Sequence, residues 1–263
     1  MEWFNIILYE PLFNTLMFLY KNVPGQDLGV AIILLTLLIK FILFWPSLSA
    51  IHSQQKMQEI QPKMKELQDK YKDNREELSK QLMAFYKVHK VNPFSSCLPL
   101  LLQLPILIAL YRVFFAGINI DPTTHLLAAD QVTHLYGSLR TAFETLQVNN
   151  MFLGFVNLTA KHNVILAVLA GAAQFWQSHM MLSQRPPKLP GAKDEDMTAM
   201  VSRNTMYLLP VMTIVFGWQF PAGLALYWLV STVFQVAQQY YYFKWHKPKQ
   251  QQPGQPEVLP KVS

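Results

Sequence analysis

Long runs of apolar residues are the feature of this sequence that most constrains its fold. The clearest run, LGVAIILLTLLIKFILFWP at residues 28–46, holds a single charged residue, Lys40. As an α-helix it would be about 28 Å long, which is close to the hydrocarbon thickness of a bilayer. Four further runs follow, at residues 93–117, 163–182, 204–218 and 222–243. We therefore expect an all-α polytopic membrane protein with five transmembrane helices.

The composition agrees with a chain that is largely dissolved in lipid. Apolar residues make up 51% of it and charged residues only 14%, against roughly 25% charged residues in an average soluble domain. This balance excludes a disordered chain and argues against an ordinary soluble enzyme. The single cysteine, Cys97, excludes an internal disulfide framework and any cysteine-based metal cluster.

Basic residues are distributed unevenly between the segments that separate the spans. Seventeen Lys and Arg residues fall in residues 47–92, 183–203 and 244–263, whereas only Lys21, Arg140 and Lys161 fall in the other connecting segments. Because cytoplasmic loops carry the excess of basic residues, we expect the N-terminus outside and the C-terminus in the cytoplasm. This distribution accounts for the high pI without any sequence-specific binding of nucleic acid.

The segments outside the spans differ in character. Residues 1–27 are apolar and rich in aromatic residues, but Glu10 and Pro11 interrupt them. This pattern is typical of a helix lying in the outer membrane interface, followed by a turn, and a short first span is the alternative. We expect residues 118–162 to form an extracytoplasmic loop, 183–203 a cytoplasmic loop and 244–263 a disordered cytoplasmic tail.

Residues 47–92 are strongly charged and carry two apolar stripes with a spacing typical of coiled coils. The first stripe consists of Met57, Ile60, Met64, Leu67 and Tyr71, and the second of Leu78, Leu82, Phe85 and His89. A turn at Asp73 and Asn74 would join two helices into an antiparallel cytoplasmic hairpin. We expect Pro62 to lie near the start of the first of these helices, where proline is tolerated.

No catalytic or metal-binding pattern is recognisable in the sequence. The seven histidines form no HExxH motif, and there is no glycine-rich phosphate loop. Adjacent carboxylates occur at Glu76-Glu77 and at 194–196, both in polar segments, where solvated surface residues are the ordinary interpretation. We therefore expect no enzyme activity, no cofactor and no metal ion.

Lys40 is the residue in the apolar runs that most needs an explanation. A basic side chain near the centre of a span costs roughly 2.5–3.5 kcal/mol on insertion scales. Its stem could extend the charge toward the inner end of the span at Pro46, or the charge could face a water-filled cavity within the membrane. The residues alone leave both interpretations open. Arg112, near the outer end of the second span, is expected to extend its charge outward.

Four stretches of the sequence carry a recognisable pattern. They are residues 31–71, KVNPFSSCLPLLLQLPILIALY at 90–111, FLGFVNLTAKHN at 152–163 and FPAGLALYWLVSTVFQVAQQYY at 220–241. In this order they resemble the YidC/Oxa family of membrane protein insertases, specifically its bacterial five-span core. The resemblance implies five helices around a hydrophilic groove that is open to the cytoplasm and the lipid and closed toward the outside.

The resemblance also implies which residues line the groove. The family carries a basic residue, usually Arg, on its first span, and Lys40 occupies the matching position. Lysine keeps the positive charge but lacks the planar guanidinium that binds a carboxylate through two hydrogen bonds. Gln177 and Trp228 match further groove positions, and Tyr227 and Gln103 are plausible additions.

The function that the resemblance implies is the insertion and folding of integral membrane proteins in the bacterial cell membrane, by way of a wet basic groove and lateral partitioning into lipid. The implied partners are nascent membrane proteins and the lipid bilayer, with the 47–92 hairpin contacting the Sec translocon, the ribosome or a targeting factor. Two alternatives stay open. One is a small channel or transporter with Lys40 as its selectivity charge, and the other is a membrane assembly scaffold without a translocation role.

Overall fold

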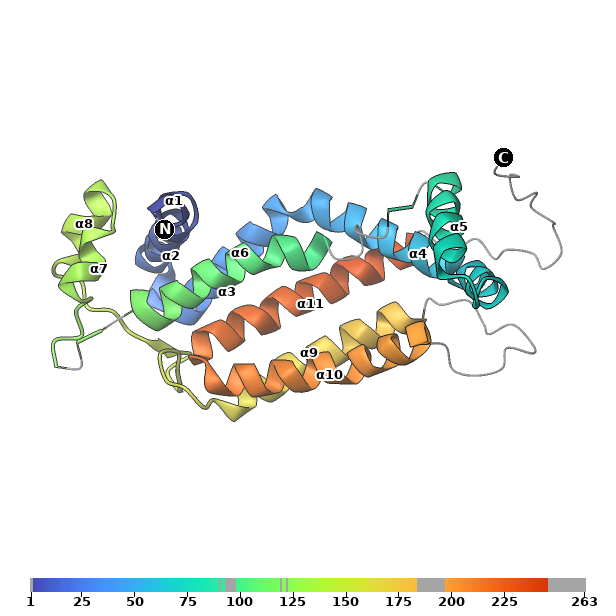
Figure 1. Ribbon diagram of the computed structural model, residues 1–263. Coiled ribbons are helices and arrows are strands. Elements are labelled where there is room, and N and C mark those ends of the chain that lie inside the picture. The colour runs from blue at the N-terminus through green and yellow to red at the C-terminus, as the bar shows by residue number, and fades with distance from the viewer. Residues whose placement is uncertain are drawn as a thin grey trace.

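The computed structural model describes residues 2–89, 91–92, 98–118, 120–121, 123–183 and 197–245. Its helices form an elongated bundle, with α2, α7 and α8 at one end and the α4–α5 hairpin at the other (Figure 1). The chain is mostly helical, and its only regular strands among the described residues are the two-residue strands β1 and β2.

The N-terminal segment is helical from Glu2 to Asn22. It consists of α1 (Glu2–Phe4), the π-helical turn η1 (Asn5–Tyr9) and α2 (Glu10–Asn22), and the short 3-10 helix η2 (Pro24–Gln26) follows. Pro11 does not interrupt this segment. It is the second residue of α2 and follows the π-helical turn, where the backbone hydrogen bonding already departs from the regular α-helical pattern. The helix is thus continuous where the sequence suggested a break.

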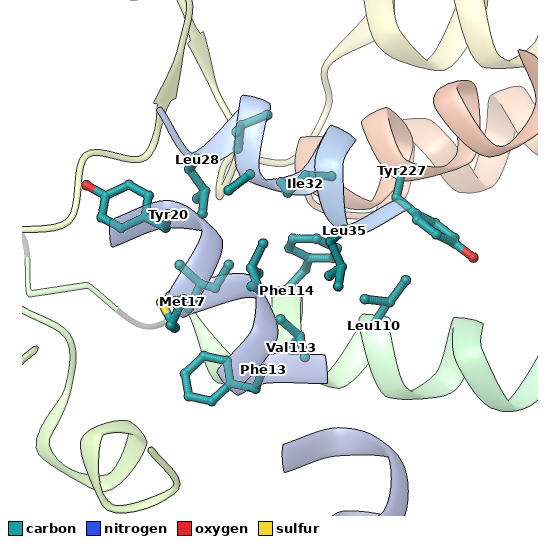
Figure 2. Packing of buried hydrophobic residues seen from close by; sticks show 14 of the residues in the cluster. Phe13, Met17, Tyr20, Leu28, Ile32, Leu35, Leu110, Val113, Phe114 and Tyr227 are labelled. Carbon is teal, nitrogen blue, oxygen red and sulfur yellow. The ribbon is translucent and has the colours of Figure 1, made fainter. Parts of the chain in front are cut away.

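One face of α2 lies in the main hydrophobic core. Phe13, Leu16, Met17 and Tyr20 are fully buried there. Figure 2 shows Phe13 and Met17 close to Val113 and Phe114, and Tyr20 near Leu28. The apolar residues of this segment are therefore needed for packing inside the protein as well as for any contact with lipid.

The first expected span corresponds to a bent pair of helices. α3 (Leu28–Ile42) is capped at its N-terminus by Asp27, whose Oδ1 accepts hydrogen bonds from the amides of Gly29 at 2.7 Å and Val30 at 3.1 Å. This is the usual chemistry of a helix N-cap. α3 ends at Ile42, and α4 (Phe44–Lys70) continues at an angle of 65° to it.

The expected position of Pro62 near the start of a helix is wrong. α4 runs from Phe44 to Lys70, so Pro62 lies in its interior. An interior proline costs about 3 kcal/mol or more. Ile60 and Met64, on either side of it, both pack in the core of the hairpin. Packing on both sides of a proline can outweigh its local cost, because tertiary contacts supply most of the stability of a helix in a protein.

The hairpin has a small hydrophobic core of its own. α5 (Arg75–Val88) is capped at its N-terminus by Asn74, whose side-chain oxygen accepts a hydrogen bond from the amide of Glu77 at 3.1 Å. The buried members of this core are Ile60, Leu67, Phe85 and Val91, and Met57, Met64, Tyr71, Leu82 and Tyr86 pack against them. The burial of Tyr86 raises the pKa of its phenol.

The second expected span contains α6 (Leu98–Arg112) and the π-helical turn η4 (Val113–Gly117). α6 continues through Pro105. Residues 93–97 of this expected span, with Cys97, lie outside the described residues.

The segment between the second and third expected spans is more structured than a loop. It contains α7 (Ala129–Thr133), α8 (Gly137–Phe143) and the antiparallel strands β1 (Met151–Phe152) and β2 (Val156–Asn157). Leu135, Phe143 and Leu158 from this segment are buried in the main core. The segment therefore forms a folded cap over one end of the bundle, and the fold class is helical with one small β-hairpin.

The last three helices pack closely together. They are α9 (Val164–Ser183), α10 (Met197–Gln219) and α11 (Ala222–Trp245). A Cβ atom added to Gly171 on α9 would lie 2.3 Å from Ile214 Cγ1 on α10. Glycine is required at such a close approach between helices. Residues 184–196, in the expected cytoplasmic loop, and 246–263, in the expected tail, lie outside the described residues.

By length and apolar composition alone, α9 is the one described helix that could cross a bilayer unaided, over Val164–Met181. The bent pair formed by α3 and the first part of α4 meets the same criterion when it is taken as one span. α6 and α10 carry shorter apolar stretches, Leu101–Phe115 and Met206–Gln219. α11 is long enough, but glutamine, serine and threonine side chains lower its hydropathy.

Candidate functional site

Lys40 lies on the buried face of α3. This face also contains Leu28, Ile32, Leu35, Thr36 and Ile39, at the spacing of three and four residues that aligns side chains along a helix. The Lys40 side chain is only 5% exposed. Its ammonium group therefore points into the helix bundle, which favours an interior polar site over a side chain extended along the lipid-facing surface.

A chain of hydrogen bonds joins Lys40 to two other helices. Lys40 Nζ donates to Gln103 Oε1 on α6 at 3.3 Å, and Gln103 Nε2 donates to the hydroxyl of Tyr227 on α11. A glutamine amide suits this position because its oxygen can accept from an ammonium while its nitrogen donates elsewhere. The structure thus brings together three of the residues expected in the groove.

Among the residues that the structure describes, no acid is paired with Lys40. Two ion pairs found there are Lys80 with Glu76 on the hairpin and His134 with Glu10 at the opposite end of the bundle. Lys40 takes part in neither, and its described partner is the neutral Gln103. A buried ammonium held by a neutral amide keeps its capacity to attract an incoming carboxylate, since Coulomb attraction strengthens as the local dielectric constant falls.

A polar stripe runs along α11 beyond Tyr227. It consists of Tyr227, Ser231, Gln235, Gln238 and Tyr242, at successive spacings of four, four, three and four residues. Each spacing is close to one helical turn, so these side chains lie along one face of α11. We refer to this set as the α11 polar stripe.

Neighbouring helices hydrogen-bond to the α11 polar stripe at several levels. Gln177 Nε2 on α9 donates to Gln235 Oε1 at 2.7 Å. Ser47 Oγ on α4 donates to Gln238 Oε1 at 2.8 Å. Farther along, His52 Nδ1 and the Tyr242 hydroxyl are 2.7 Å apart. The stripe therefore meets α6, α9 and α4 in turn.

Gln177 and Trp228, which were also expected in the groove, are not part of the Lys40 cluster. The hydrogen bonds of Gln177 join it to Gln174 and Gln235, and Gln235 lies about 12 Å along α11 from Tyr227 by helical rise. Trp228 is half-buried and enters none of the hydrogen bonds or ring contacts described between residues of this structure. Sequence reasoning missed Gln238, Tyr242 and Ser47, although the regular polar spacing on α11 could have revealed the first two.

The end of the bundle near η1 and α2 is covered by polar contacts. Arg112 Nη1 donates to Asn5 Oδ1 at 2.6 Å, and its guanidinium lies 5.2 Å from the centre of the Phe4 ring. Arg112 therefore contacts the N-terminal helical segment, where the sequence suggested only an outward-pointing charge. At the end of η1, the Tyr9 hydroxyl donates to Gln131 Oε1 on α7 at 3.2 Å.

Comparison with known proteins identifies a family for this chain. The family model of the 60Kd inner membrane protein matches residues 18–250. A protein from Syntrophobacter fumaroxidans named membrane protein insertase YidC is 37% identical over 240 residues, which cover 91% of this chain and 38% of that protein. Proteins of the same name from Marinobacter nauticus and Magnetococcus marinus are 34% and 33% identical, and the matches cover 88% and 92% of this chain.

The chain is much shorter than these relatives. The matched regions cover 38%, 34% and 36% of their lengths, so the chain spans little more than a third of each of them. The family match nevertheless extends over most of the chain and includes the helices that carry Lys40, Gln103, Gln177 and Tyr227. The chain therefore belongs to the 60Kd inner membrane protein family and, as that description says, is a protein of the inner membrane.

Proposed function

We propose that this chain is a membrane protein insertase that crosses the bacterial inner membrane five times, with its N-terminus outside and its C-terminus in the cytoplasm. The spans would be 28–46, 93–117, 163–182, 204–218 and 222–243. The observation that carries the proposal is the buried cation Lys40. Its ammonium is hydrogen-bonded to Gln103, which in turn is hydrogen-bonded to Tyr227 in the interior of the bundle. The names of the relatives and the uneven distribution of basic residues support it.

In this proposal the polar side chains on α3, α6, α9 and α11 line a wet groove within the membrane. A substrate's polar tail cannot cross bare hydrocarbon cheaply, because its charges and backbone groups would lose their water. Gln177, Gln235 and Gln238 would offer replacement hydrogen bonds along the α11 polar stripe. The groove would thereby shorten the distance that the tail travels without water.

Lys40 would act on the charge of the tail. An ammonium in a medium of low dielectric constant attracts acidic residues more strongly than one in bulk water. The membrane potential would add about 2.3 kcal/mol per elementary charge for each 100 mV. These terms require no nucleotide hydrolysis and no bound cofactor, so electrostatics and partitioning together would drive the step.

The apolar segment of the substrate would leave the groove sideways into lipid. The second and fourth spans would supply this surface, because α6 and α10 expose apolar side chains, among them Leu101, Leu104, Ile108, Leu208 and Val211. Transfer of an apolar segment from water to such a surface and then to lipid is favourable by about 25 cal/mol per Å² of buried apolar area.

The α4–α5 hairpin would receive substrates on the cytoplasmic side. It lies at the end of the bundle opposite α7 and α8 (Figure 1). Its apolar side chains are mostly used in its own core, so its charged surface remains available for a partner. The Sec translocon, the ribosome and a targeting factor are the partners that we propose for it.

Reconstitution tests the proposal directly. Purified chain in proteoliposomes should insert a single-span substrate so that its tail becomes protected from external protease. Lys40→Ala should lower protection of an acidic tail about tenfold, because a hydrogen bond or ion pair to a charged group is worth about 1.5–3 kcal/mol. It should spare a neutral tail.

Lys21→Ala is the matched control, because it removes one exposed lysine from α2, away from both the Lys40 site and the α4–α5 hairpin, and should change neither substrate. Folded wild-type chain that protects no tail would contradict an insertase and favour an assembly scaffold. Ion conductance without tail protection would favour a channel.

A further inference from the structure

The β-hairpin between α8 and α9 presents apolar side chains that the proposed insertion route does not use. β1 and β2 pair with Met151 opposite Asn157 and Phe152 opposite Val156. Residues 153–155 connect them, and we call these three residues the hairpin tip. Leu153 is 61% exposed and Phe155 is 72% exposed. Both side chains therefore project away from the protein.

The backbone conformation of the hairpin tip is unfavourable for Leu153. The amide of Phe155 donates to the carbonyl of Phe152 at 3.2 Å, which closes a tight turn. Leu153 has φ of +50° and Gly154 has φ of +79°. Turns with two such residues favour Asn-Gly, because a Cβ atom crowds the following carbonyl in the left-handed conformation. In water, Leu153 would combine backbone strain with an exposed apolar side chain.

A positive φ at a residue other than glycine indicates a function when the surrounding structure holds that conformation in place. The amide of Leu153 donates to Asp27 Oδ2 at 2.8 Å. The other oxygen of the same carboxylate caps the first turn of α3. The Phe152 ring lies against Gly29, so closely that an added Cβ atom would be 2.0 Å from Phe152 Cδ2. The hairpin tip is thus fixed to the first turn of α3.

This attachment also sets the depth of the hairpin tip in a membrane. α3 begins at Leu28, which is the outer boundary of the first proposed span. A backbone atom that hydrogen-bonds the N-cap of that helix lies at the level where hydrocarbon gives way to headgroups. Apolar and aromatic side chains are favoured at this level.

Other apolar side chains are exposed at the same end of the bundle. They include Val164 and Ile165 in the first turn of α9 and Trp218 near the end of α10. The chain after β2 is bonded to the start of α11, because the amides of Ala222 and Gly223 donate to the carbonyls of Ala160 and Leu158. The β-hairpin therefore connects the outer ends of α3 and α11.

We propose that the hairpin tip is a lipid anchor, in which Leu153 and Phe155 insert at the boundary between headgroups and acyl chains of the outer leaflet. The anchor holds the outer ends of α3 and α11 at a constant depth while the rest of the bundle handles a substrate. Lipid at this level removes the apolar side chains from water, which offsets the strained backbone of Leu153. This inference rests on the proposed orientation and goes beyond the insertion activity.

Spin labels measure this depth. In a Cys97→Ser background, a nitroxide is attached to a single cysteine in Phe155→Cys, Leu153→Cys or Ser138→Cys, and each protein is reconstituted in vesicles of phosphatidylcholine and phosphatidylglycerol. Ser138 is an exposed residue of α8 and serves as the aqueous control. The labels at 153 and 155 should be several-fold more accessible to oxygen, relative to a water-soluble nickel chelate, than the label at 138.

Equal nickel accessibility at 155, 153 and 138 would overturn the proposal. Shielding of residue 155 in native membranes but not in pure lipid vesicles would also overturn it, because a protein partner would then cover the tip. This experiment measures the depth of the spin labels and not the protease protection of a substrate tail. Either result therefore leaves the proposed insertion activity to be tested by the proteoliposome assay.

Discussion

Lys40 Nζ on α3 lies 3.3 Å from Gln103 Oε1 on α6. The same glutamine donates from Nε2 to Tyr227 on α11, so one neutral side chain orients the ammonium and fixes it relative to a third helix. Because Gln103 has no charge, it holds Lys40 without cancelling the positive potential that an acidic tail would meet.

Gln103→Glu should therefore inhibit the insertion of acidic-tailed substrates although Lys40 is intact. A carboxylate at this position would pair with the ammonium in a charge-assisted hydrogen bond, and the pair would offer little net charge. We expect about a tenfold loss of tail protection in proteoliposomes, comparable to that of Lys40→Ala. Gln103→Met, which keeps the length of the side chain and the free charge of Lys40, should lose less. Wild-type insertion by Gln103→Glu would show that the charge is not used.

The orientation of the chain can be read from cysteine labelling. In a Cys97→Ser background, Thr141→Cys on α8 should react with a membrane-impermeant reagent added outside the cell. Asp73→Cys, in the turn of the α4–α5 hairpin, should react only after permeabilisation. Both native residues are exposed, so reactivity reports which side of the membrane they face. Outside labelling at residue 73 would reverse the proposed topology.

Gly171→Ala should destabilise the contact between α9 and α10. The added methyl group would lie 2.3 Å from Ile214 Cγ1 and 3.2 Å from the carbonyl oxygen of Pro210. Overpacking of this kind costs about 1–3 kcal/mol, which should appear as a lower Tm in detergent. Ile214→Ala in the same chain should recover part of the loss, because the two substitutions are in contact and their effects are not additive.

Ala172→Met is the control for this pair, since Ala172 is exposed on α9 and a longer side chain there meets no neighbour in the core. A Gly171→Ala protein with the Tm of the wild type would contradict the close approach of the two helices.

The hairpin core should unfold independently of the bundle. Phe85 is buried at its centre, and truncation of such a residue costs about 3–5 kcal/mol. Phe85→Ala should speed hydrogen exchange across α4 and α5 while exchange in α9 stays unchanged. Met83→Ala, at a position that is 63% exposed, should change neither. Faster exchange in α9 of Phe85→Ala would mean that the hairpin and the bundle unfold together.

The parts of the fold that follow from periodicity were accessible from the sequence. The spacing of Ile60, Leu67 and Phe85 places them in one core, and a lysine in an apolar run requires a partner such as Gln103. The first inference depends on helical spacing within α4 and within α5, where side-chain direction is fixed by local geometry. The second depends on the free-energy cost of an unpaired charge in an apolar run.

The cap formed by α7, α8 and the β-hairpin was not accessible in the same way. These elements are short, and long-range contacts stabilise them. Asn14 Nδ2 donates to the carbonyl of His134 at 2.9 Å, and the amide of Asn149 donates to the Tyr20 hydroxyl at 2.7 Å. A sequence shows no periodicity for contacts between residues more than a hundred positions apart. The placement of Pro62 was wrong for a related reason, because packing on both sides of the proline outweighed its local preference.

The turn at Asp121 should respond to acid. Its carboxylate accepts hydrogen bonds from the amides of Thr123 at 2.8 Å and Thr124 at 2.9 Å and from the Thr123 hydroxyl. These bonds, led by that from the Thr123 hydroxyl, lower the pKa of Asp121 from 3.8 to about 2. A carboxyl group whose pKa is lower in the folded state stabilises that state above its unfolded pKa. The stabilisation is therefore complete above about pH 4 and is lost as the pH falls toward 2.

Hydrogen exchange at the amides of Thr123 and Thr124 measures this loss. After correction for the intrinsic pH dependence of exchange, protection in the wild type should be high at pH 5 and should fall between pH 4 and pH 2. Asp121→Asn keeps an acceptor oxygen but cannot titrate in this range, so its protection should be lower at pH 5 and nearly constant with pH. A pH-independent wild type would show that Asp121 does not hold the turn. A fall of equal size in Asp121→Asn would assign the acid response to another group.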